Sequence, residues 1–273
     1  MDIHKVIQEY DQMFGKKTLE EIYTFLQSKI EEAEREESTP SKITLYNEMI
    51  GLCRELDRKE EGNRYCDELI NLVEALGLGH TVEQGTIFLN VANAKRAFGL
   101  WEESLKFYRS AEVIYKEKLS EDAFYFASLY NNWSILYQEM GDYENAEKMI
   151  RRSLQIVDIY PEAYIEQAST RTNLAGILMQ ARKECSGQEK EAIHYLQQAL
   201  ALYERDERKD FHYSFALSAM GDAMALKGDY RKAAFYYEKG MREIESYVGR
   251  TGLYSKIREK YDGSRTAYRR CLL

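Results

Sequence analysis

The sequence contains little proline, no long apolar run and no block of basic residues. Only Pro40 and Pro161 occur among its 273 residues, so long stretches are free of the residue that most disrupts helices. No apolar run reaches the roughly 18 residues that a transmembrane helix needs. Acidic residues outnumber basic ones by 46 to 38, for a net charge of −8, and no row of Lys and Arg could neutralise a line of phosphates. These absences favour an all-helical protein and argue against a membrane span and a nucleic-acid partner.

The cysteines and histidines are scattered along the chain. No CxxC pair occurs, and no histidine stands at a metal-ligand spacing from a cysteine. We therefore expect no metal site, no cofactor, and reduced, mostly packed thiols at Cys53, Cys66, Cys185 and Cys271. The N-terminal stretch MDIHKVIQEY lacks the basic region and apolar segment of a secretion signal, which favours a cytoplasmic location.

A turn residue recurs at a constant interval along the chain. Gly15, Asp57, Gly99 and Gly141 are spaced 42 residues apart, and Gly228 follows Gly141 after 87 residues. Apolar residues lie at helical spacing on both sides of these anchors, and glycine can adopt the positive φ that ends a helix. Each period therefore predicts two amphipathic helices joined by a tight turn.

Small and aromatic side chains recur at fixed distances from the anchors. The small residues are Gly62, Ser104, Ala146 and Ala233 five positions after the turn, and Ala92, Ser134 and Gly221 seven positions before it. The aromatic residue two positions after the turn is Trp101, Tyr143 or Tyr230. We expect the paired helices to approach each other at the small residues and the aromatic to fill the wedge between them. Neither helix can bury its apolar face alone, so neighbouring hairpins must stack.

The segments GDYENAEKMIRRSLQI at 141–156 and GDYRKAAFYYEKGMREI at 228–244 resemble the tetratricopeptide repeat family. The common unit of that family has about 34 residues. The longer unit here is similar to the long-helix repeats of kinesin light chains and bacterial peptide-sensing regulators. The resemblance extends over residues 41–250 and implies an all-α fold, a right-handed α-solenoid of antiparallel helical hairpins.

The resemblance organises the chain as a single solenoid domain over residues 1–273. Its parts are a divergent N-terminal hairpin at 1–40, five repeats at 41–250 and a C-terminal capping helix at 251–273. Thr18 is the expected N-cap of the second helix, and Gly263 is an expected break in the last one. In the fourth repeat the polar insertion ARKECSGQEK lengthens the turn.

The sequence lacks a nucleophile elbow, a P-loop, a dinucleotide-binding turn and a metal-ligand helix pair, which favours a protein with no catalytic residues. In tetratricopeptide repeats the first helix of each pair lines the inner face. An asparagine nine positions before the turn glycine often reaches into the groove there. Asn90, Asn132 and Asn173 stand at this place, so the resemblance implies a ladder of three amides. An amide offers both a donor and an acceptor, which suits the backbone of an extended peptide.

The remaining residues predicted on the inner face are also mostly polar and uncharged. They are Asn93, Arg96, Asn131, Gln138, Ser169, Thr172, Gln180, Ser218 and Asp222. In an alternative interpretation, the asparagines only form hydrogen bonds within the stack and orient its helices. Repeats that bind chaperone tails carry Lys and Arg at inner positions, where this chain has Ser169 and Asn173, so that activity is not expected.

The resulting prediction is a non-catalytic module that binds a peptide or a helix of a partner protein in a concave groove. One alternative is a peptide-responsive bacterial regulator, although the first forty residues are short and acidic for a DNA-binding segment. Another is the regulatory portion of a larger enzyme that continues beyond residue 273. The apolar last turn, with Ala267 and Tyr268, supports that alternative.

Overall fold

The computed structural model describes residues 1–77, 80–181, 188–205, 211–248 and 252–271. These residues form thirteen α-helices and no strand, which confirms the prediction of an all-α fold built from helical hairpins. None of the helices in these ranges is long and apolar enough to cross a membrane.

The chain divides into two compact units, Met1–Asn132 and Trp133–Leu273. The boundary falls inside one helix, α7 (Phe124–Glu139).

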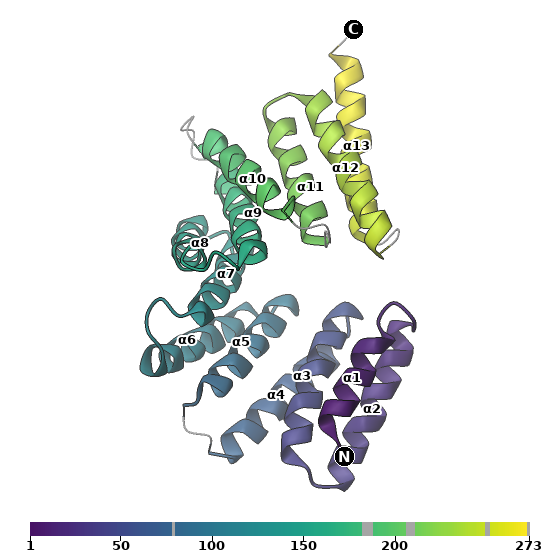
Figure 1. Ribbon diagram of the computed structural model, residues 1–273, viewed down its shortest axis with the longest axis vertical. Coiled ribbons are helices and arrows are strands. Elements are labelled where there is room, and N and C mark those ends of the chain that lie inside the picture. The colour runs from purple at the N-terminus through teal and green to yellow at the C-terminus, as the bar shows by residue number, and fades with distance from the viewer. Residues whose placement is uncertain (78–79, 182–187, 206–210, 249–251, 272–273) are drawn as a thin grey trace. The chain divides into compact units, whose positions relative to one another are not determined.

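The first unit consists of consecutive antiparallel hairpins, which Figure 1 shows side by side. Its helices before α7 are α1 (Ile3–Met13), α2 (Leu19–Arg35), α3 (Thr39–Glu55), α4 (Lys59–Ala75), α5 (Val82–Ala97) and α6 (Trp101–Lys118). The predicted N-cap is confirmed, because the Thr18 hydroxyl accepts the Glu21 N–H and the Glu21 carboxylate accepts the Thr18 N–H. This reciprocal capping box satisfies two backbone donors that the helix itself leaves unpaired.

Every predicted turn anchor adopts a left-handed backbone conformation. The φ angles are 75° at Gly15, 55° at Asp57, 81° at Gly99, 78° at Gly141 and 80° at Gly228. After Gly99 the N–H of Leu100 donates to the carbonyl of Lys95 at 2.8 Å, and equivalent bonds follow the Asp57, Gly141 and Gly228 turns. This Schellman-type bond satisfies a carbonyl at the helix end. At the second turn Asp57 adopts the required positive φ although it has a side chain.

The small residues mark the places where paired helices approach, as predicted. The Ser104 hydroxyl of α6 donates to the Ala92 carbonyl of α5 at 2.8 Å, which joins the two small positions of one repeat directly. A Cβ atom added to Gly221 would lie 2.5 Å from the Tyr237 ring, closer than unbonded carbon atoms can approach. All of the predicted small residues are buried: Gly62, Ala92, Ser104, Ser134, Ala146, Gly221 and Ala233.

The prediction that an aromatic after the turn fills the wedge between helices is wrong for Trp101, which is 40% exposed. Instead Phe98, just before the turn, covers Gly62 of the preceding hairpin so closely that a Cβ there would collide with its ring. Trp101 is the first residue of α6, where a side chain does not have to point at the neighbouring helix.

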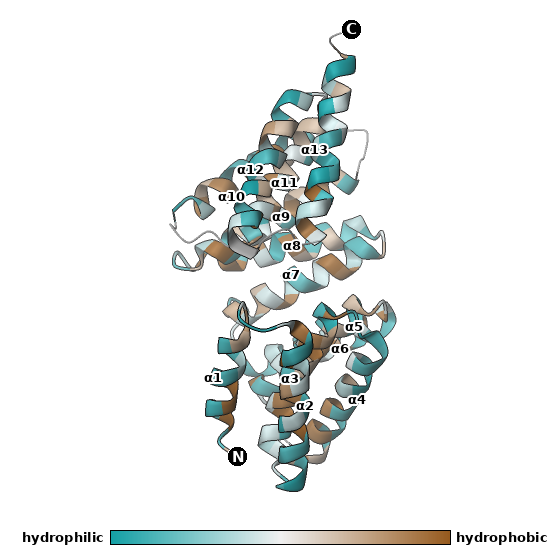
Figure 2. Cartoon of the chain, turned by 90° about the vertical axis from the view of Figure 1, so that its right-hand side faces the viewer, coloured by the Kyte–Doolittle hydropathy of each residue, from teal (hydrophilic) through white to brown (hydrophobic). Residues whose placement is uncertain are grey.

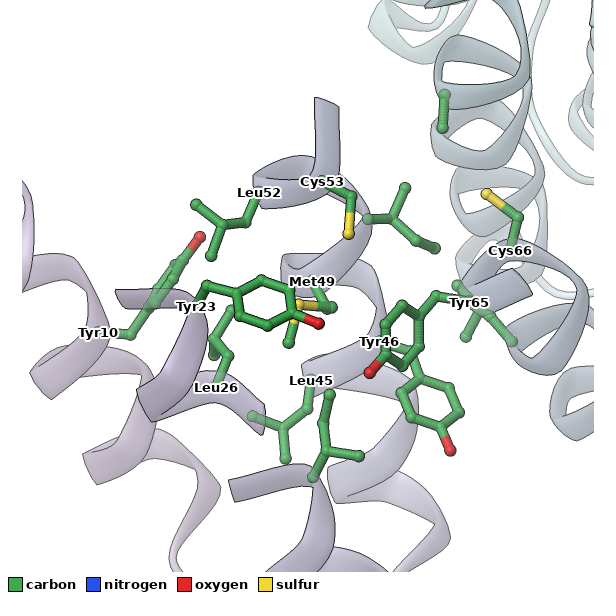
Figure 3. Packing of buried hydrophobic residues seen from close by; sticks show 14 of the residues in the cluster. Tyr10, Tyr23, Leu26, Leu45, Tyr46, Met49, Leu52, Cys53, Tyr65 and Cys66 are labelled. Atoms are coloured by element: carbon green, nitrogen blue, oxygen red, sulfur yellow. The ribbon is translucent and has the colours of Figure 1, made fainter. Parts of the chain in front are cut away.

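Tyrosines and aliphatic residues fill the core of the first unit. Figure 3 shows Tyr10, Tyr23, Tyr46 and Tyr65 among leucines and Met49 of the neighbouring helices. The Cys66 thiol is buried in the same core, and burial raises its pKa to about 12. As predicted, Cys53 and Cys66 are packed free thiols, whereas Cys271 is exposed; Cys185 lies outside the described residues.

A buried lysine ties the hairpin of α3 and α4 to the hairpin of α5 and α6. The Lys95 side chain is 1% exposed, and its ammonium donates to Asn63 at 2.6 Å, Asp67 at 2.7 Å and Glu103 at 2.8 Å. Burial opposes the charge, but the hydrogen bonds that Lys95 donates to the two carboxylates outweigh it and raise the pKa of Lys95. All three ammonium protons are satisfied, which is what a buried charge requires.

The second unit continues the pattern of hairpins after α7. Its helices are α8 (Tyr143–Val157), α9 (Tyr164–Ala181), α10 (Gln188–Tyr203), α11 (Phe211–Leu226), α12 (Tyr230–Val248) and α13 (Gly252–Arg270). The first helices α9 and α11 of neighbouring hairpins contact each other, in addition to their own second helices. Most of the predicted insertion, residues 182–187, lies outside the described residues.

The expected break near Gly263 is wrong, because α13 continues through this residue to Arg270. A glycine costs a helix about 1 kcal/mol, and packing of α13 on α12 compensates for it. Ile257 and Ser264 are buried, while much of the remaining surface of α13 is hydrophilic (Figure 2).

Candidate functional site

A groove of about 550 Å³ lies within the second unit. Its largest contributions come from the first helices α9 and α11, which lie side by side. Gln138 of α7 and Tyr143 of α8 border it on one side, and Lys260 of α13 borders it on the other. The volume is within the range of natural ligand pockets, about 300–1,000 Å³.

Small side chains form part of the groove lining. Gly176 of α9 has no side chain, and Ser218 and Ala219 of α11 are only 5% and 9% exposed. A Cβ atom placed on Gly176 would meet only the Gln138 amide nitrogen, at 3.9 Å. The backbone of α9 is therefore accessible from the groove at Gly176.

Apolar side chains line the groove beside these small residues. Phe215 and Leu226 of α11 are 49% and 47% exposed, and Met179 of α9 is partly buried. Half-exposed aromatic and aliphatic side chains that line one groove are typical of contact sites for a ligand.

The two charged residues of the groove lining are bound to each other. Lys260 donates to one oxygen of the Asp222 carboxylate at 2.7 Å, and the Tyr237 hydroxyl donates to the other oxygen at 2.7 Å. Burial, together with the hydrogen bond to Asp222, raises the pKa of Tyr237. The phenol stays protonated at neutral pH and holds the carboxylate in place.

Several residues predicted from the sequence line this groove. They are Gln138, Thr172, Asn173, Gln180, Ser218 and Asp222. Ser169 lies on α9 but does not line it. The sequence does not indicate Phe215 and Leu226 as lining residues, because apolar residues at helical spacing are expected in the core. It does not indicate Lys260 either, because the last helix is expected only to cap the stack.

In the first unit, the predicted asparagines form hydrogen bonds within the protein. The Asn90 amide of α5 donates to the Asn47 side chain of α3 at 3.0 Å, which links the first helices of neighbouring hairpins. Asn132 donates to the Ser128 carbonyl, one turn earlier in α7, at 2.9 Å. These bonds are the kind that orient a stack.

The other predicted residues of the first unit are also integrated into the helices. Asn93 accepts the Tyr108 hydroxyl of α6 at 2.7 Å. Arg96 and Asn131 are partly buried, on α5 and α7. Asn90 and Asn132 belong to the first unit and Asn173 to the second, so a ladder of all three as one binding site stays a prediction.

Comparison with known proteins confirms the predicted resemblance. Residues 125–205 match the family model described as tetratricopeptide repeat, a range that includes Gln138, Asn173 and Gly176 of the groove. A search of curated proteins finds no match.

Solved structures of repeat proteins share the fold at low identity. NprR in complex with its cognate peptide NprX superposes with a TM-score of 0.70 at 16% identity, covering 96% of this chain and 73% of that chain. BtubC (BKLC) from P. vanneervenii gives 0.66 at 17% identity, covering 85% and 92%. The apo form of RapI gives 0.62 at 15% identity, covering 98% and 72%. At these identities the likeness establishes the fold, a stack of helical hairpins.

Proposed function

We propose that this chain, whose residues 125–205 match the tetratricopeptide repeat model, is a non-catalytic protein-interaction module. It binds a peptide segment of a partner protein in the groove between α9 and α11. The observation that carries this proposal is the groove itself, in which amide side chains, small residues and half-exposed apolar side chains line about 550 Å³. NprR, which shares the fold, was solved in complex with its cognate peptide NprX, and this supports a peptide as the class of ligand. The cytoplasmic location predicted from the sequence is part of the proposal.

The amides supply the polar contacts of this mechanism. Gln138 and Asn173 come from two different first helices, α7 and α9, and line the same groove. Each amide can donate and accept, so together they can follow the N–H and C=O groups of a bound backbone. A groove that is already formed by packed helices needs little ordering when the peptide binds, which favours affinity.

The variant Gly176→Leu tests the groove directly. The position has room for a side chain, and leucine favours a helix by about 1 kcal/mol relative to glycine, so the fold is retained while the side chain fills the groove. The matched control is Gly263→Leu on α13, where an added Cβ meets no atom within 4 Å and which is not part of the lining.

The experiment begins by selecting linear nonapeptides from a random phage-displayed library on the wild-type protein. The affinities of synthetic copies are then measured by fluorescence anisotropy. We expect Gly176→Leu to weaken binding at least tenfold and Gly263→Leu to leave it unchanged, with equal helicity of both by circular dichroism. Selected peptides that bind Gly176→Leu as tightly as the wild type would contradict the proposal, as would a failure to select any peptide.

A further inference from the structure

We infer that the ligand of the groove between α9 and α11 is an extended, electrically neutral peptide segment that carries a bulky apolar side chain. This inference rests on the proposed function and specifies its ligand. Three features of the groove carry it: the internal pairing of its charges, the exposed apolar side chains, and the amides that line it beside small residues.

The charges of the groove are already compensated. Both oxygens of the Asp222 carboxylate accept hydrogen bonds, one from Tyr237 and one from Lys260. The Lys260 and Asp222 side chains are 44% and 37% exposed, so a ligand can reach them. A charged ligand group would have to compete with this ion pair and would also lose part of its own hydration. A neutral segment avoids both costs.

The apolar side chains of the groove need an apolar counterpart. Phe215 and Leu226 both lie on α11 and line the groove, and about half of each is exposed to solvent. Covering them with a ligand side chain removes apolar surface from water, at roughly 25 cal/mol for each Å². The two side chains stand eleven residues apart on α11, about 16 Å along the helix axis, so one leucine, methionine or aromatic residue of the ligand can cover either of them but not both.

The amides favour an extended segment over a helix. A helix satisfies its backbone N–H and C=O groups internally, so Gln138 and Asn173 would find few partners on it. An extended segment presents unpaired groups along its length. Gly176 and Ala219 have at most one side-chain carbon and allow a backbone to come close to the groove lining.

The test uses the peptides selected on the wild type and two charge variants of the groove. Lys260→Gln leaves the Asp222 carboxylate without its cation. Asp222→Asn removes the negative charge, yet its amide oxygen can still accept the Tyr237 hydroxyl. For each selected peptide, two derivatives are made, with one Lys or one Glu added beside the apolar residue.

We expect the selected peptides to be uncharged next to a shared Leu, Met, Phe or Trp, and their affinity for wild type to change less than twofold with salt concentration. Both charged derivatives should bind wild type more weakly than the parent peptide. The Lys derivative should bind Lys260→Gln about two- to fivefold more tightly than wild type, because it can pair with the freed Asp222 carboxylate. The Glu derivative should show the same gain with Asp222→Asn, because it can pair with the freed Lys260 ammonium. A gain of this size is what a solvent-accessible ion pair contributes.

The outcomes separate the two proposals. If Gly176→Leu abolishes binding but the selected peptides share a charged residue, the inference is wrong and the proposed function stands. The same conclusion follows if the charged derivatives bind wild type as tightly as the parent peptide. If the selected peptides bind Gly176→Leu as tightly as the wild type, or if no peptide is selected, both the proposed function and the inference are wrong. A wild-type dimer in sedimentation that Gly176→Leu dissociates would assign the groove to a second copy of the chain and overturn both.

Discussion

The close approach of α11 and α12 at Gly221 predicts that adding a single methyl group destabilises the second unit. In Gly221→Ala the new Cβ would lie 2.5, 2.6 and 2.9 Å from three carbons of the Tyr237 ring. The ring is 2% exposed and its hydroxyl is bonded to Asp222, so it has little freedom to move. One of the two helices must shift, or the hydrogen bond must break.

Opposing effects determine how much Gly221→Ala changes the free energy of unfolding. Replacing glycine by alanine inside a helix gains about 1 kcal/mol. Overpacking typically costs about 1–3 kcal/mol, and loss of a hydrogen bond to a charged group costs a further 1.5–3 kcal/mol, roughly. The two costs exceed the gain, and we expect a net loss of about 1.5–5 kcal/mol.

Gly176→Ala is the matched control, since it makes the same change in the neighbouring first helix α9 of the same unit. There the added Cβ meets only one atom, at 3.9 Å, so the helix-propensity gain remains and stability should rise by about 0.5–1 kcal/mol. Urea unfolding followed by circular dichroism measures both variants. If Gly221→Ala is as stable as Gly176→Ala, the two helices do not approach at Gly221 as described and the reasoning fails.

Further predictions concern single contacts in both units. Lys95→Met removes a buried ammonium that three acceptors hold, and we expect urea unfolding to show a loss of about 1–3 kcal/mol; unchanged stability would mean that the cluster does not join its hairpins. The Ser214 hydroxyl is fully buried without a hydrogen-bond partner among the described residues, so Ser214→Ala should be neutral or stabilising by up to about 1 kcal/mol, and a marked loss in the same assay would reveal a partner. The hydrogen bond from the Thr18 N–H, followed by that from Lys17, lowers the pKa of Glu21 to about 2. Because this folded-state pKa lies below the ordinary value of 4.5, the stabilisation from the capping box is complete above about pH 4.5 and is lost as the pH falls through about 2. An NMR titration that gives Glu21 its ordinary pKa would contradict the capping box.

The fold was predictable because each repeat needs the same backbone conformation at its turn, in addition to similar side chains at matching positions. The anchor position needs a positive φ, and this need is visible as glycine in four of the five anchors. The second anchor is Asp57 instead of glycine, but the constant interval of 42 residues identifies it. Its φ of 55° is positive, like the φ angles of the glycine anchors. At these positions the repeat interval and the residue type at the turn predict the same backbone conformation, and such agreement makes a local prediction reliable.

Side-chain direction and long-range pairing were not predictable in the same way. The repeat locates Trp101 correctly but does not determine whether a side chain on the first turn of a helix points inward. Lys95 looks like an ordinary surface lysine in the sequence, since two of its three acceptors, Asn63 and Asp67, lie about thirty residues earlier. The interaction becomes visible only when neighbouring hairpins are stacked.

The predicted site shows why polar residues on a first helix have two different explanations. Asn93 and Asp222 occupy the same place in their repeats, six residues before the turn glycine. Each accepts a tyrosine hydroxyl from the second helix of its own hairpin, and the tyrosine follows fifteen residues later in both, at Tyr108 and Tyr237. These polar side chains therefore have a partner inside the hairpin, whatever else they bind.

One of the two intervening repeats supports this assignment. Around Gly141 the same two places hold Ile135 and Ile150, so the polar residue and the tyrosine are replaced together by an apolar pair. Gln138 and Asn173 lie at other places in their repeats, outside this pairing, and line the groove. A polar residue that is matched by a tyrosine fifteen positions later is explained by hairpin packing, and Asn173 stands at the place where Asn90 and Asn132 form bonds within the stack, which leaves the amide of Gln138 as the strongest candidate for contact with a ligand.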